Sequence, residues 1–450
     1  MLSSWRRRRA NRRAKNSSNN NTSENNNMEL AIPNHFRCPI SLDMMRDPVT
    51  LSSGITYDRE SIETWIEAGN RTCPITNQVL RSLDPIPNHT IRRMIQDWCV
   101  ENRSYGVERI PTPRIPISTI EVTEMIEKIS AARRRQDLEG CQELVRKVKE
   151  LSKESERNWR CFTANGIASA LSATFQAFAE ESPSSSSSSS TKNVAVLEEA
   201  LSCLPSFMPF DEAAKSYLGS SSSLRCMVWF LKHGILSARR NAILVLKGLV
   251  SSDQEGLKTL LDIEGNVEAL VKLIKEPICP VATKASLVVI FHMISTTPSN
   301  ETLISSFGEM GLVSLLLEML VDSDRSACEK ALGVFDEMCS CSAGREKAYE
   351  HALTVPVVVK KLLRISDSAT EISVSILWKL CKNEKREEDG NALVEALQGG
   401  AFQKLLLLLQ VGSSERTKEK ATELLKMLNL KRGNLECIES IDFKNLKRSF

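Results

Sequence analysis

The sequence predicts a mainly α-helical chain in which a small mixed α+β domain is followed by a long helical solenoid. Residues 33–105 alternate short β-prone runs with Pro, Cys and Trp, whereas residues 119–432 show helical periodicity almost throughout. Within residues 119–432, two apolar sequence motifs recur, and both have a period of about 45 residues. A chain of 450 residues is long enough for about two to four domains of about 150 residues each.

The charge composition argues against a nucleic-acid-binding chain. Lys and Arg number 59 against 56 Asp and Glu, which gives a formal net charge of +3. The first 15 residues alone carry +7, so the rest of the chain sums to −4. No apolar run approaches the roughly 18–20 residues that span a bilayer, and the N-terminus lacks the apolar segment of a secretion signal. We therefore expect neither a nucleic-acid partner nor a transmembrane segment.

The 13 cysteines indicate a reducing compartment. They are irregularly spaced and form no Cys-x-x-Cys pair, so they suggest neither a disulfide framework nor a structural zinc site. We expect a cytoplasmic protein, with the nucleus and the periphery of the plasma membrane as alternatives. Three interpretations of Arg6–Arg9 stay open: a nuclear-import signal, a contact for acidic lipid or nucleic acid, and a solubilising tail.

Composition shifts divide the chain into five parts. They are a basic, Asn/Ser-rich and disordered tail (1–32), the mixed domain (33–105), a Pro-containing linker (106–118), the helical repeats (119–432) and a C-terminal tail (433–450). Inside the helical region, two serine-rich stretches are expected to be loops, at 182–191 and 220–223.

The helical region consists of repeats. One motif is an apolar helix that starts at Gly265, Gly311 and Gly400. A fourth copy of this motif starts at Val355 and lacks the glycine. The other is a helix with a small residue near its start, and it recurs at Ala242, Ala285, Ala331, Ser375 and Ala421. Two interleaved series with one period fit the helical units of armadillo or HEAT solenoids. One buried stripe is predicted from Ala327, Ala331, Val334, Phe335 and Met338.

The mixed domain is expected to hold a hairpin and two helices. Val49–Leu51 and Ile55–Tyr57 are β-prone runs on either side of Gly54, which can take the positive φ of a turn. Asp58 is a suitable N-cap for a helix that carries Trp65 and stops before Gly69. A second helix is predicted from Thr90, with a buried face made of Ile91, Met94, Ile95, Trp98 and Cys99.

Two loops of this domain resemble each other: Cys38-Pro-Ile-Ser41 and Cys73-Pro-Ile-Thr76. A zinc cross-brace would place Cys where Ser41 and Thr76 stand. The domain has too few ligands for two zinc sites, since its candidates are His35, Cys38, Cys73, His89 and Cys99. We expect no metal and no cofactor, and interpret Cys38 and Cys73 as buried structural thiols rather than nucleophiles or ligands.

Hydrogen bonds must then replace what a metal would supply. A structural zinc contributes about 10–16 kcal/mol in small finger peptides, against about 0.5–1.5 kcal/mol for one hydrogen bond. Several polar contacts are therefore needed. The candidates for this network are Ser41, Asp43, Ser52, Ser53, Tyr57, Glu60 and Thr76.

The stretch CPISLDMMRDPVTLSSGITYDRESIETWIEAG, with TCPIT and IRRMIQDW after it, resembles a U-box, the zinc-free relative of the RING fold in ubiquitin ligases. A U-box followed by armadillo repeats is similar to the plant U-box/armadillo E3 ubiquitin-protein ligases. The basic start is similar to a stress- and elicitor-responsive subgroup of them. The resemblance implies a role in plant stress or defence signalling.

The resemblance also implies partners and contact residues. A ubiquitin-charged conjugating enzyme (E2) would dock on the two loops and beside the first helix, and the contact residues would be Ile40, Leu42, Trp65, Pro74 and Asn77. Many family members place a basic residue where this chain has Asn77. The repeats would recruit a protein substrate, and homodimerisation stays open.

The E2 would keep the thioester, because no His or Lys stands where it would activate Cys38 or Cys73. The U-box would then promote direct transfer of ubiquitin to substrate lysines by orientation. Three alternatives stay open. The chain is a non-catalytic armadillo adaptor with an inactive U-box, the domain is a zinc RING, or Ile40 and Trp65 are core residues.

Overall fold

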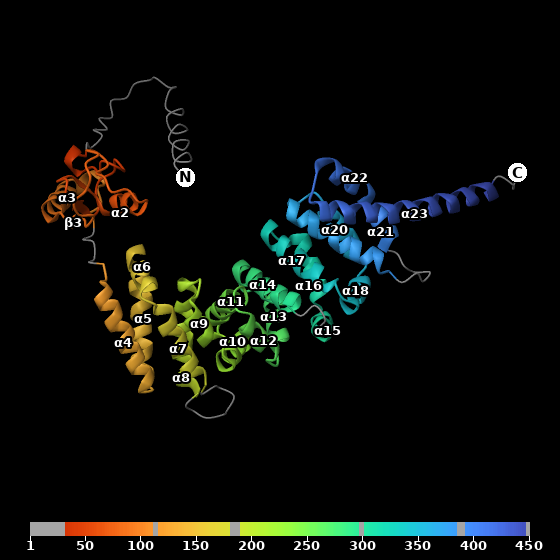
Figure 1. The fold of residues 1–450 in the computed structure, drawn as a ribbon, viewed down its shortest axis with the longest axis horizontal. Coiled ribbons are helices and arrows are strands. Elements are labelled where there is room, and N and C mark those ends of the chain that lie inside the picture. The colour runs from red at the N-terminus through yellow and green to blue at the C-terminus, as the bar shows by residue number, and fades with distance from the viewer. Residues whose placement is uncertain (1–31, 111–115, 181–189, 297–300, 385–391, 447–450) are drawn as a thin grey trace, which may run out of the picture. The chain divides into compact units, whose positions relative to one another are not determined.

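The computed structural model describes residues 32–110, 116–180, 190–296, 301–384 and 392–446, and it divides the chain into two compact units on either side of residue 115. Figure 1 shows a small N-terminal unit with short strands and a helical unit made of successive helices. The mainly α-helical class, with a small sheet near the N-terminus, is confirmed. The predicted N-terminal tail, residues 1–32, lies outside the described residues except for Ile32.

The N-terminal unit contains a three-stranded antiparallel sheet and two helices. Its elements are η1 (Asn34–Phe36), β1 (Pro48–Thr50), β2 (Thr56–Asp58), α2 (Arg59–Glu67), β3 (Ile86–Pro87), α3 (His89–Glu101) and η2 (Arg103–Tyr105). The strand order is β2-β1-β3, and Val49 pairs with both Tyr57 and Pro87. Val49 and Tyr57 are fully buried. The predicted hairpin is confirmed, with Gly54 at φ +80° in its turn.

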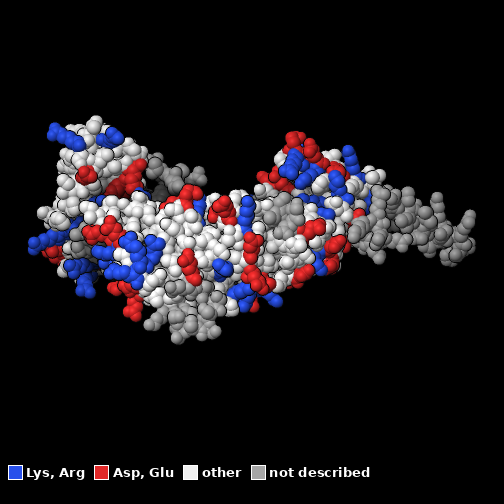
Figure 2. All heavy atoms as spheres, turned by 60° about the horizontal axis from the view of Figure 1, so that its bottom comes forward, with Lys and Arg blue, Asp and Glu red and all other residues white. Residues whose placement is uncertain are grey.

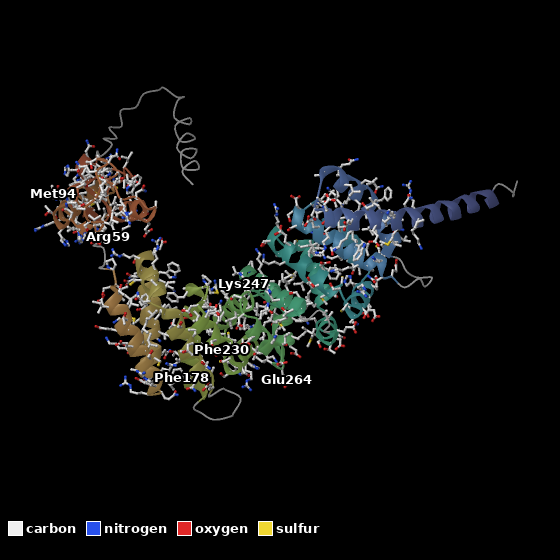
Figure 3. The ribbon with its side chains drawn as sticks, in the orientation of Figure 1. Arg59, Met94, Phe178, Phe230, Lys247 and Glu264 are labelled. Carbon is white, nitrogen blue, oxygen red and sulfur yellow. The ribbon has the colours of Figure 1, made fainter. Side chains whose placement is uncertain are left out.

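The second helix of this unit differs from the prediction at two points. α3 begins at His89, one residue early, because the Asn88 side chain accepts a hydrogen bond from the Ile91 N–H at 3.0 Å and caps the helix. Met94, predicted to be buried, is 43% exposed and points away from the unit (Figure 3). It lies at the edge of the apolar stripe, whose centre is Ile95 and Cys99.

The helical unit runs from α4 to α23. Its first part holds α4 (Thr119–Arg134), α5 (Leu138–Glu154), α6 (Glu156–Ala164), α7 (Ile167–Ala179), α8 (Ser190–Cys203), η3 (Leu204–Phe207), α9 (Glu212–Leu218), α10 (Ser221–His233), α11 (Leu236–Val250) and α12 (Gln254–Leu261). The rest holds α13 (Asn266–Lys275), α14 (Pro280–Thr296), α15 (Glu301–Glu309), α16 (Leu312–Asp322), α17 (Arg325–Met338), α18 (Ser342–Tyr349), α19 (Thr354–Lys361), α20 (Asp367–Lys382), α21 (Ala392–Gln398), α22 (Ala401–Val411) and α23 (Glu415–Leu446).

The predicted small-residue helices form a ladder in which each packs on the next: α11, α14, α17, α20 and α23. The residues of the small-residue series, Ala242, Ala285, Ala331, Ser375 and Ala421, are all buried. The predicted stripe of α17 is buried as well. One continuous apolar core joins residues from Val122 to Leu428, so the unit stacks as a solenoid.

Side-chain hydrogen bonds fix the register between neighbouring helices of this ladder. Lys379 Nζ of α20 donates to Asp336 Oδ1 and to the Asp336 carbonyl of α17, both at 2.7 Å. Trp378 Nε1 donates to Glu423 Oε2 of α23 at 2.6 Å. Lys420 Nζ reaches back from α23 to Ser375 Oγ at 2.8 Å. Each of these hydrogen bonds joins residues that are one repeat apart in the sequence.

Three segments differ from their predicted loop, linker or tail. Ser220 caps α10 by accepting a hydrogen bond from the Ser223 N–H, so the second serine run starts a helix instead of forming a loop. Most of the first run lies outside the described residues, and α8 begins at Ser190. α23 continues to Leu446, through residues expected to form a tail. The predicted linker is partly folded, since Ile110 packs on the N-terminal core and Ser118 caps α4.

Charged side chains of both signs are interleaved over the face shown in Figure 2, as the near balance of 59 and 56 suggests. No single helix in the described ranges is both long and apolar enough to cross a membrane. Two bent helix pairs reach that length and composition only when taken together, and they are Glu301–Glu309 with Leu312–Asp322 and Ala392–Gln398 with Ala401–Val411.

The glycine that recurs at the start of the apolar helix motif has a backbone explanation. Gly265, Gly311 and Gly400 each precede their helix with φ near +78°, in the left-handed region. α19 is the copy of this motif that lacks the glycine. It starts differently, because Leu353 before it has φ −88°. The repeat therefore uses Gly where the turn needs a left-handed residue.

We predict different effects on stability for alanine substitution of two glycines in one repeat. Gly311→Ala should lower the free energy of unfolding by about 1–2 kcal/mol, because a Cβ disfavours the left-handed conformation. Gly333→Ala, inside α17, should leave stability unchanged or raise it, since the new Cβ would lie at an ordinary contact distance of 3.7 Å from the Phe291 ring. Urea-unfolding midpoints of the full chain measure both, and equal midpoints would contradict the backbone explanation.

Candidate functional site

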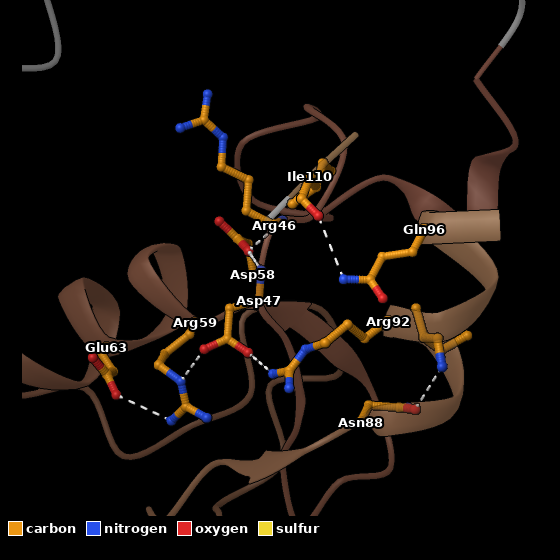
Figure 4. Close-up of polar contacts among 10 residues, drawn as sticks. Arg46, Asp47, Asp58, Arg59, Glu63, Asn88, Arg92, Gln96 and Ile110 are labelled. Carbon is orange, nitrogen blue, oxygen red and sulfur yellow. Dashed lines mark hydrogen bonds and ion pairs between the residues drawn. The ribbon is translucent and has the colours of Figure 1, made fainter. Parts of the chain in front are cut away.

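One carboxylate in the N-terminal unit binds two arginines (Figure 4). Asp47, which precedes β1, accepts from Arg59 Nε at 2.6 Å and from Arg92 Nη2. Arg59 starts α2 and Arg92 lies in α3, so this carboxylate connects both helices to the sheet. The side chains of Asp47, Arg59 and Arg92 are 18%, 14% and 14% exposed. Glu63 binds Arg59 from the other side, at 3.4 Å.

Asp58 orients the segment that carries Asp47. Its Oδ1 accepts hydrogen bonds from the backbone N–H groups of Arg46 and Asp47, at 2.9 and 2.8 Å. The residue stands at the predicted N-cap position of α2, but its side chain does not cap the helix. Burial raises the pKa of Asp58, and the two N–H groups oppose that rise by stabilising the carboxylate.

A second polar group lies on the sheet and ties it to α3. Thr50 Oγ1 and Thr56 Oγ1 are 2.9 Å apart across the hairpin. Asn88 Nδ2 donates to both hydroxyls, at 3.1 and 3.2 Å, while its Oδ1 caps α3. One amide therefore links two strands and a helix by hydrogen bonds alone.

A third polar group surrounds the buried thiol of Cys73. Ser53 Oγ donates to Cys73 Sγ at 3.3 Å, and the Tyr57 hydroxyl lies 3.0 Å from the same sulfur. Burial raises the pKa of Cys73, but hydrogen bonds from Ser53, Thr76 and Tyr57 outweigh it and lower that pKa from its ordinary value of 9.0 to about 6. Burial and the contact with Cys73 raise the pKa of Tyr57.

The two Cys-Pro-Ile loops have the same backbone hydrogen bonds. In residues 37–44, the Cys38 N–H donates to the Asp43 carbonyl and the Leu42 N–H to the Cys38 carbonyl, both at 2.8 Å. In residues 72–79, the Cys73 N–H donates to Gln78 and the Asn77 N–H to Cys73, both at 2.9 Å. We call these segments the paired loops. Each is closed by an isolated β-bridge between its first and last residues.

Each loop also has one residue in the left-handed region at the same position. Leu42 has φ +63° and Asn77 has φ +56°. Both loops approach Tyr57, because its hydroxyl contacts Cys73 and the Ile75 backbone, and Cys38 is near enough to raise its pKa. The resemblance between the two loops, noted in the sequence, is therefore a resemblance of backbone structure.

The structure places most of the predicted contact residues on the surface of the paired loops. Ile40 is 38% exposed and Leu42 is 56% exposed, Pro74 is half-buried, and Asn77 is exposed. Trp65 is half-buried on α2, where it packs against the core of the unit and donates from Nε1 to the Thr72 carbonyl at 2.9 Å. Trp65 thereby fixes α2 to the second loop.

One apolar residue of the second loop was missing from the predicted site. Ile75 is 53% exposed and occupies the position in its loop that Ile40 occupies in the first. The repeated Cys-Pro-Ile sequence was the signal that could have found it. Val79, at the end of the same loop, is 76% exposed.

The predicted polar network is only partly observed. Ser53, Tyr57 and Thr76 meet at Cys73, while Ser52 bonds the Arg81 N–H and the Ser82 carbonyl. Ser41 Oγ accepts only a local bond, from the Asp43 N–H at 3.4 Å, among the residues described. The Glu60 side chain is exposed and accepts no hydrogen bond within residues 32–110, so including it was wrong. Sequence reasoning missed the contacts of Asp47, Arg59, Asn88 and Arg92, and it gave Asp58 a capping role instead of its bonds to Arg46 and Asp47, because polar side chains are usually solvated and nothing local marks these as paired.

The three cysteines of this unit, Cys38, Cys73 and Cys99, are buried and free. Within the described part of the chain, no group of three or more His, Cys, Asp or Glu side chains is placed to hold a metal ion. The core of the unit is closed by apolar packing and by the three polar groups at Asp47, Asn88 and Cys73.

Comparison with known proteins agrees with this architecture. The family described as U-box domain matches residues 32–104, and the family described as plant U-box protein ARM repeat region matches residues 121–448. The chain is 45% identical to U-box domain-containing protein 21 of Arabidopsis thaliana, over 94% of each chain.

The chain belongs to the plant U-box proteins with armadillo repeats. It is also 35% identical to E3 ubiquitin-protein ligase PUB22 of Arabidopsis thaliana, over 89% of this chain and 95% of that one. Among solved structures, a designed armadillo repeat protein aligns with a TM-score of 0.44 at 18% identity, over 56% of this chain and 99% of that one. The paired loops lie inside the U-box.

We predict that removing the central carboxylate opens the U-box. Asp47→Ala leaves two nearly buried guanidinium groups without their partner, which should cost about 3 kcal/mol and speed amide exchange of β1 and α2 about a hundredfold. Glu60→Ala, in the same helix as Arg59, should change exchange little because that side chain is exposed. Hydrogen-exchange mass spectrometry of the full chain reads both, and equal effects would contradict the role of Asp47.

We also predict that the Cys73 thiol titrates at unusually low pH. Because its folded pKa is depressed, stability from its ionisation should grow from pH 6 to pH 9 and be lost as the pH falls through about 6. Tyr57→Phe removes one donor and should move the pKa back toward 9.0. The Cβ chemical shift of labelled Cys73 measures the titration, and a pKa that Tyr57→Phe leaves unchanged would refute the assignment.

Proposed function

We propose that this chain is an E3 ubiquitin ligase. Its paired loops would bind a ubiquitin-charged E2, and its armadillo repeats would recruit a protein substrate. The observation that supports this most strongly is the pair of loops, each of which exposes an isoleucine beside a buried cysteine. The relatives named as E3 ubiquitin-protein ligases support the same activity class.

The exposed apolar side chains support a docking surface. Ile40, Leu42 and Ile75 are 38%, 56% and 53% exposed on two loops that share Tyr57 as a neighbour. Apolar groups collected on so small a unit are typical of a protein-binding site. The left-handed backbone of Leu42 and Asn77 holds the two loops in one defined shape, so the surface is formed before a partner arrives.

The chemistry would stay on the E2. Cys38, Cys73 and Cys99 are between 0% and 1% exposed, so none of these U-box thiols can receive ubiquitin while the domain is folded. The U-box would therefore act by orientation, holding the E2-bound thioester so that a substrate lysine can attack it. This gain is one of proximity, with no covalent intermediate on the ligase.

The docking contact should be small and weak, because the E2 must leave to be recharged. An interface under about 1,200 Å² and a Kd near micromolar, about −8 kcal/mol, suit such a cycle. Ile40 and Ile75 would be the anchors, while Trp65 would act mainly by fixing the second loop to α2. We further propose a cytoplasmic role in plant stress or defence signalling, as the subgroup resemblance implies.

One observation favours a second candidate, a non-catalytic armadillo adaptor. Asn77 is exposed in the second loop, and it is an uncharged amide where many family members have a basic residue. Such a residue would bridge E2 and ubiquitin, and its loss would weaken activation without disturbing the fold. If the chain discharges ubiquitin from no charged E2 while its U-box is folded, the result would contradict the ligase proposal and support the adaptor.

We predict that the docking surface depends on both isoleucines. Ile40→Ala and Ile75→Ala should each slow discharge of ubiquitin from charged E2 about five- to thirtyfold, because each removes a central apolar anchor worth about 1–2 kcal/mol. Val100→Ala is the matched control, since Val100 is 56% exposed on α3 and outside the paired loops. Single-turnover discharge assays with several E2s measure the rates. Equal rates in all three variants would remove the site assignment.

A further inference from the structure

The U-box and its flanks contain no lysine. The chain has 27 lysines, yet none lies between Lys15 and Lys128. At the average density of the chain, this stretch of 112 residues would hold about seven. Its positive charge comes from ten arginines instead. The helical unit, in contrast, uses both residue types.

The fold requires only a few of these residues to be arginine. Arg59 and Arg92 bind Asp47 through guanidinium nitrogens in nearly buried positions, which an ammonium group would not reproduce. Five others are exposed and have no guanidinium hydrogen bond or ion pair within residues 32–110: Arg46, Arg71, Arg81, Arg93 and Arg103. Arg46 points away from the Asp47 cluster in Figure 4. At exposed, unbonded positions lysine would serve the fold as well.

The chemistry of ubiquitin transfer does distinguish the two residues. A neutral lysine ε-amine attacks the thioester carbonyl of ubiquitin, an N–C bond forms and the C–S bond breaks. The E2 cysteine leaves as a thiolate, and the amine loses a proton to water. Arginine cannot follow this path, because its guanidinium stays protonated in proteins and is therefore not nucleophilic.

We propose that the absence of lysine from the U-box unit, residues 32–110, prevents a docked E2 from modifying the domain that holds it. This inference rests on the proposed ligase function. A unit of about 80 residues has a radius of gyration near 12 Å, so every side chain on it stays close to a thioester docked on its loops. A lysine there would compete with substrate lysines at high effective concentration. Ubiquitin attached there would cover the surface that binds the E2.

The test introduces lysines where the fold tolerates them. Full-length Arg93→Lys and Arg103→Lys are incubated with activating enzyme, charged E2, ATP and lysine-free ubiquitin. Matched controls are Arg93→Gln and Arg103→Gln, which lack the amine, and Arg240→Lys, an exposed change on α11 of the helical unit. Mass spectrometry then maps the attached ubiquitin, and the discharge rate of each recovered protein is measured before and after incubation.

We expect ubiquitin on the introduced lysine of Arg93→Lys or Arg103→Lys, and a several-fold loss of discharge rate after incubation. The glutamine variants and Arg240→Lys should keep their initial rates. Unmodified new lysines beside modified helical-unit lysines would overturn the inference, and so would modification without loss of rate, while the ligase function would stand in both cases. An original chain that discharges no E2 would overturn the proposed function, and this inference with it.

Discussion

In the N-terminal unit, one carboxylate joins both helices to the sheet. Asp47 binds Arg59 of α2 and Arg92 of α3, and Asp58 holds the backbone of Asp47 in position. A metal would join distant segments through shared ligands, and here two guanidinium groups join them through a shared acceptor. The cost is that three nearly buried charges must be satisfied together, which makes the domain sensitive to the loss of any one.

The helical unit solves a different problem, because its repeats contact only their neighbours. Small buried residues let α11, α14, α17, α20 and α23 pack closely. The hydrogen bonds of Lys379, Trp378 and Lys420 set how α20 lies on α17 and how α23 lies on α20. Glycine in the left-handed region then turns the chain into the apolar helices α13, α16 and α22, whereas α19 starts without one. Apolar burial supplies the stacking, and the polar contacts supply its register.

The proposed activity uses the U-box as a rigid surface without a nucleophile. Its thiols are buried, its exposed isoleucines lie on two loops of matching backbone, and its surface cations are arginines. These properties suit a domain that must hold a reactive thioester without reacting with it.

Periodicity and turn chemistry determined much of this protein from the sequence alone. The repeat period, the small-residue series, the hairpin at Gly54 and the likeness of the two loops all follow from local patterns, and all are present in the structure. Only the tertiary structure decided that Asp47 joins two helices, that Glu60 is solvated, that Met94 faces outward and that Trp65 fixes a loop. These outcomes depend on which side chains meet across long sequence separations, and a charge or an aromatic ring has no local pattern that distinguishes a buried partner from water.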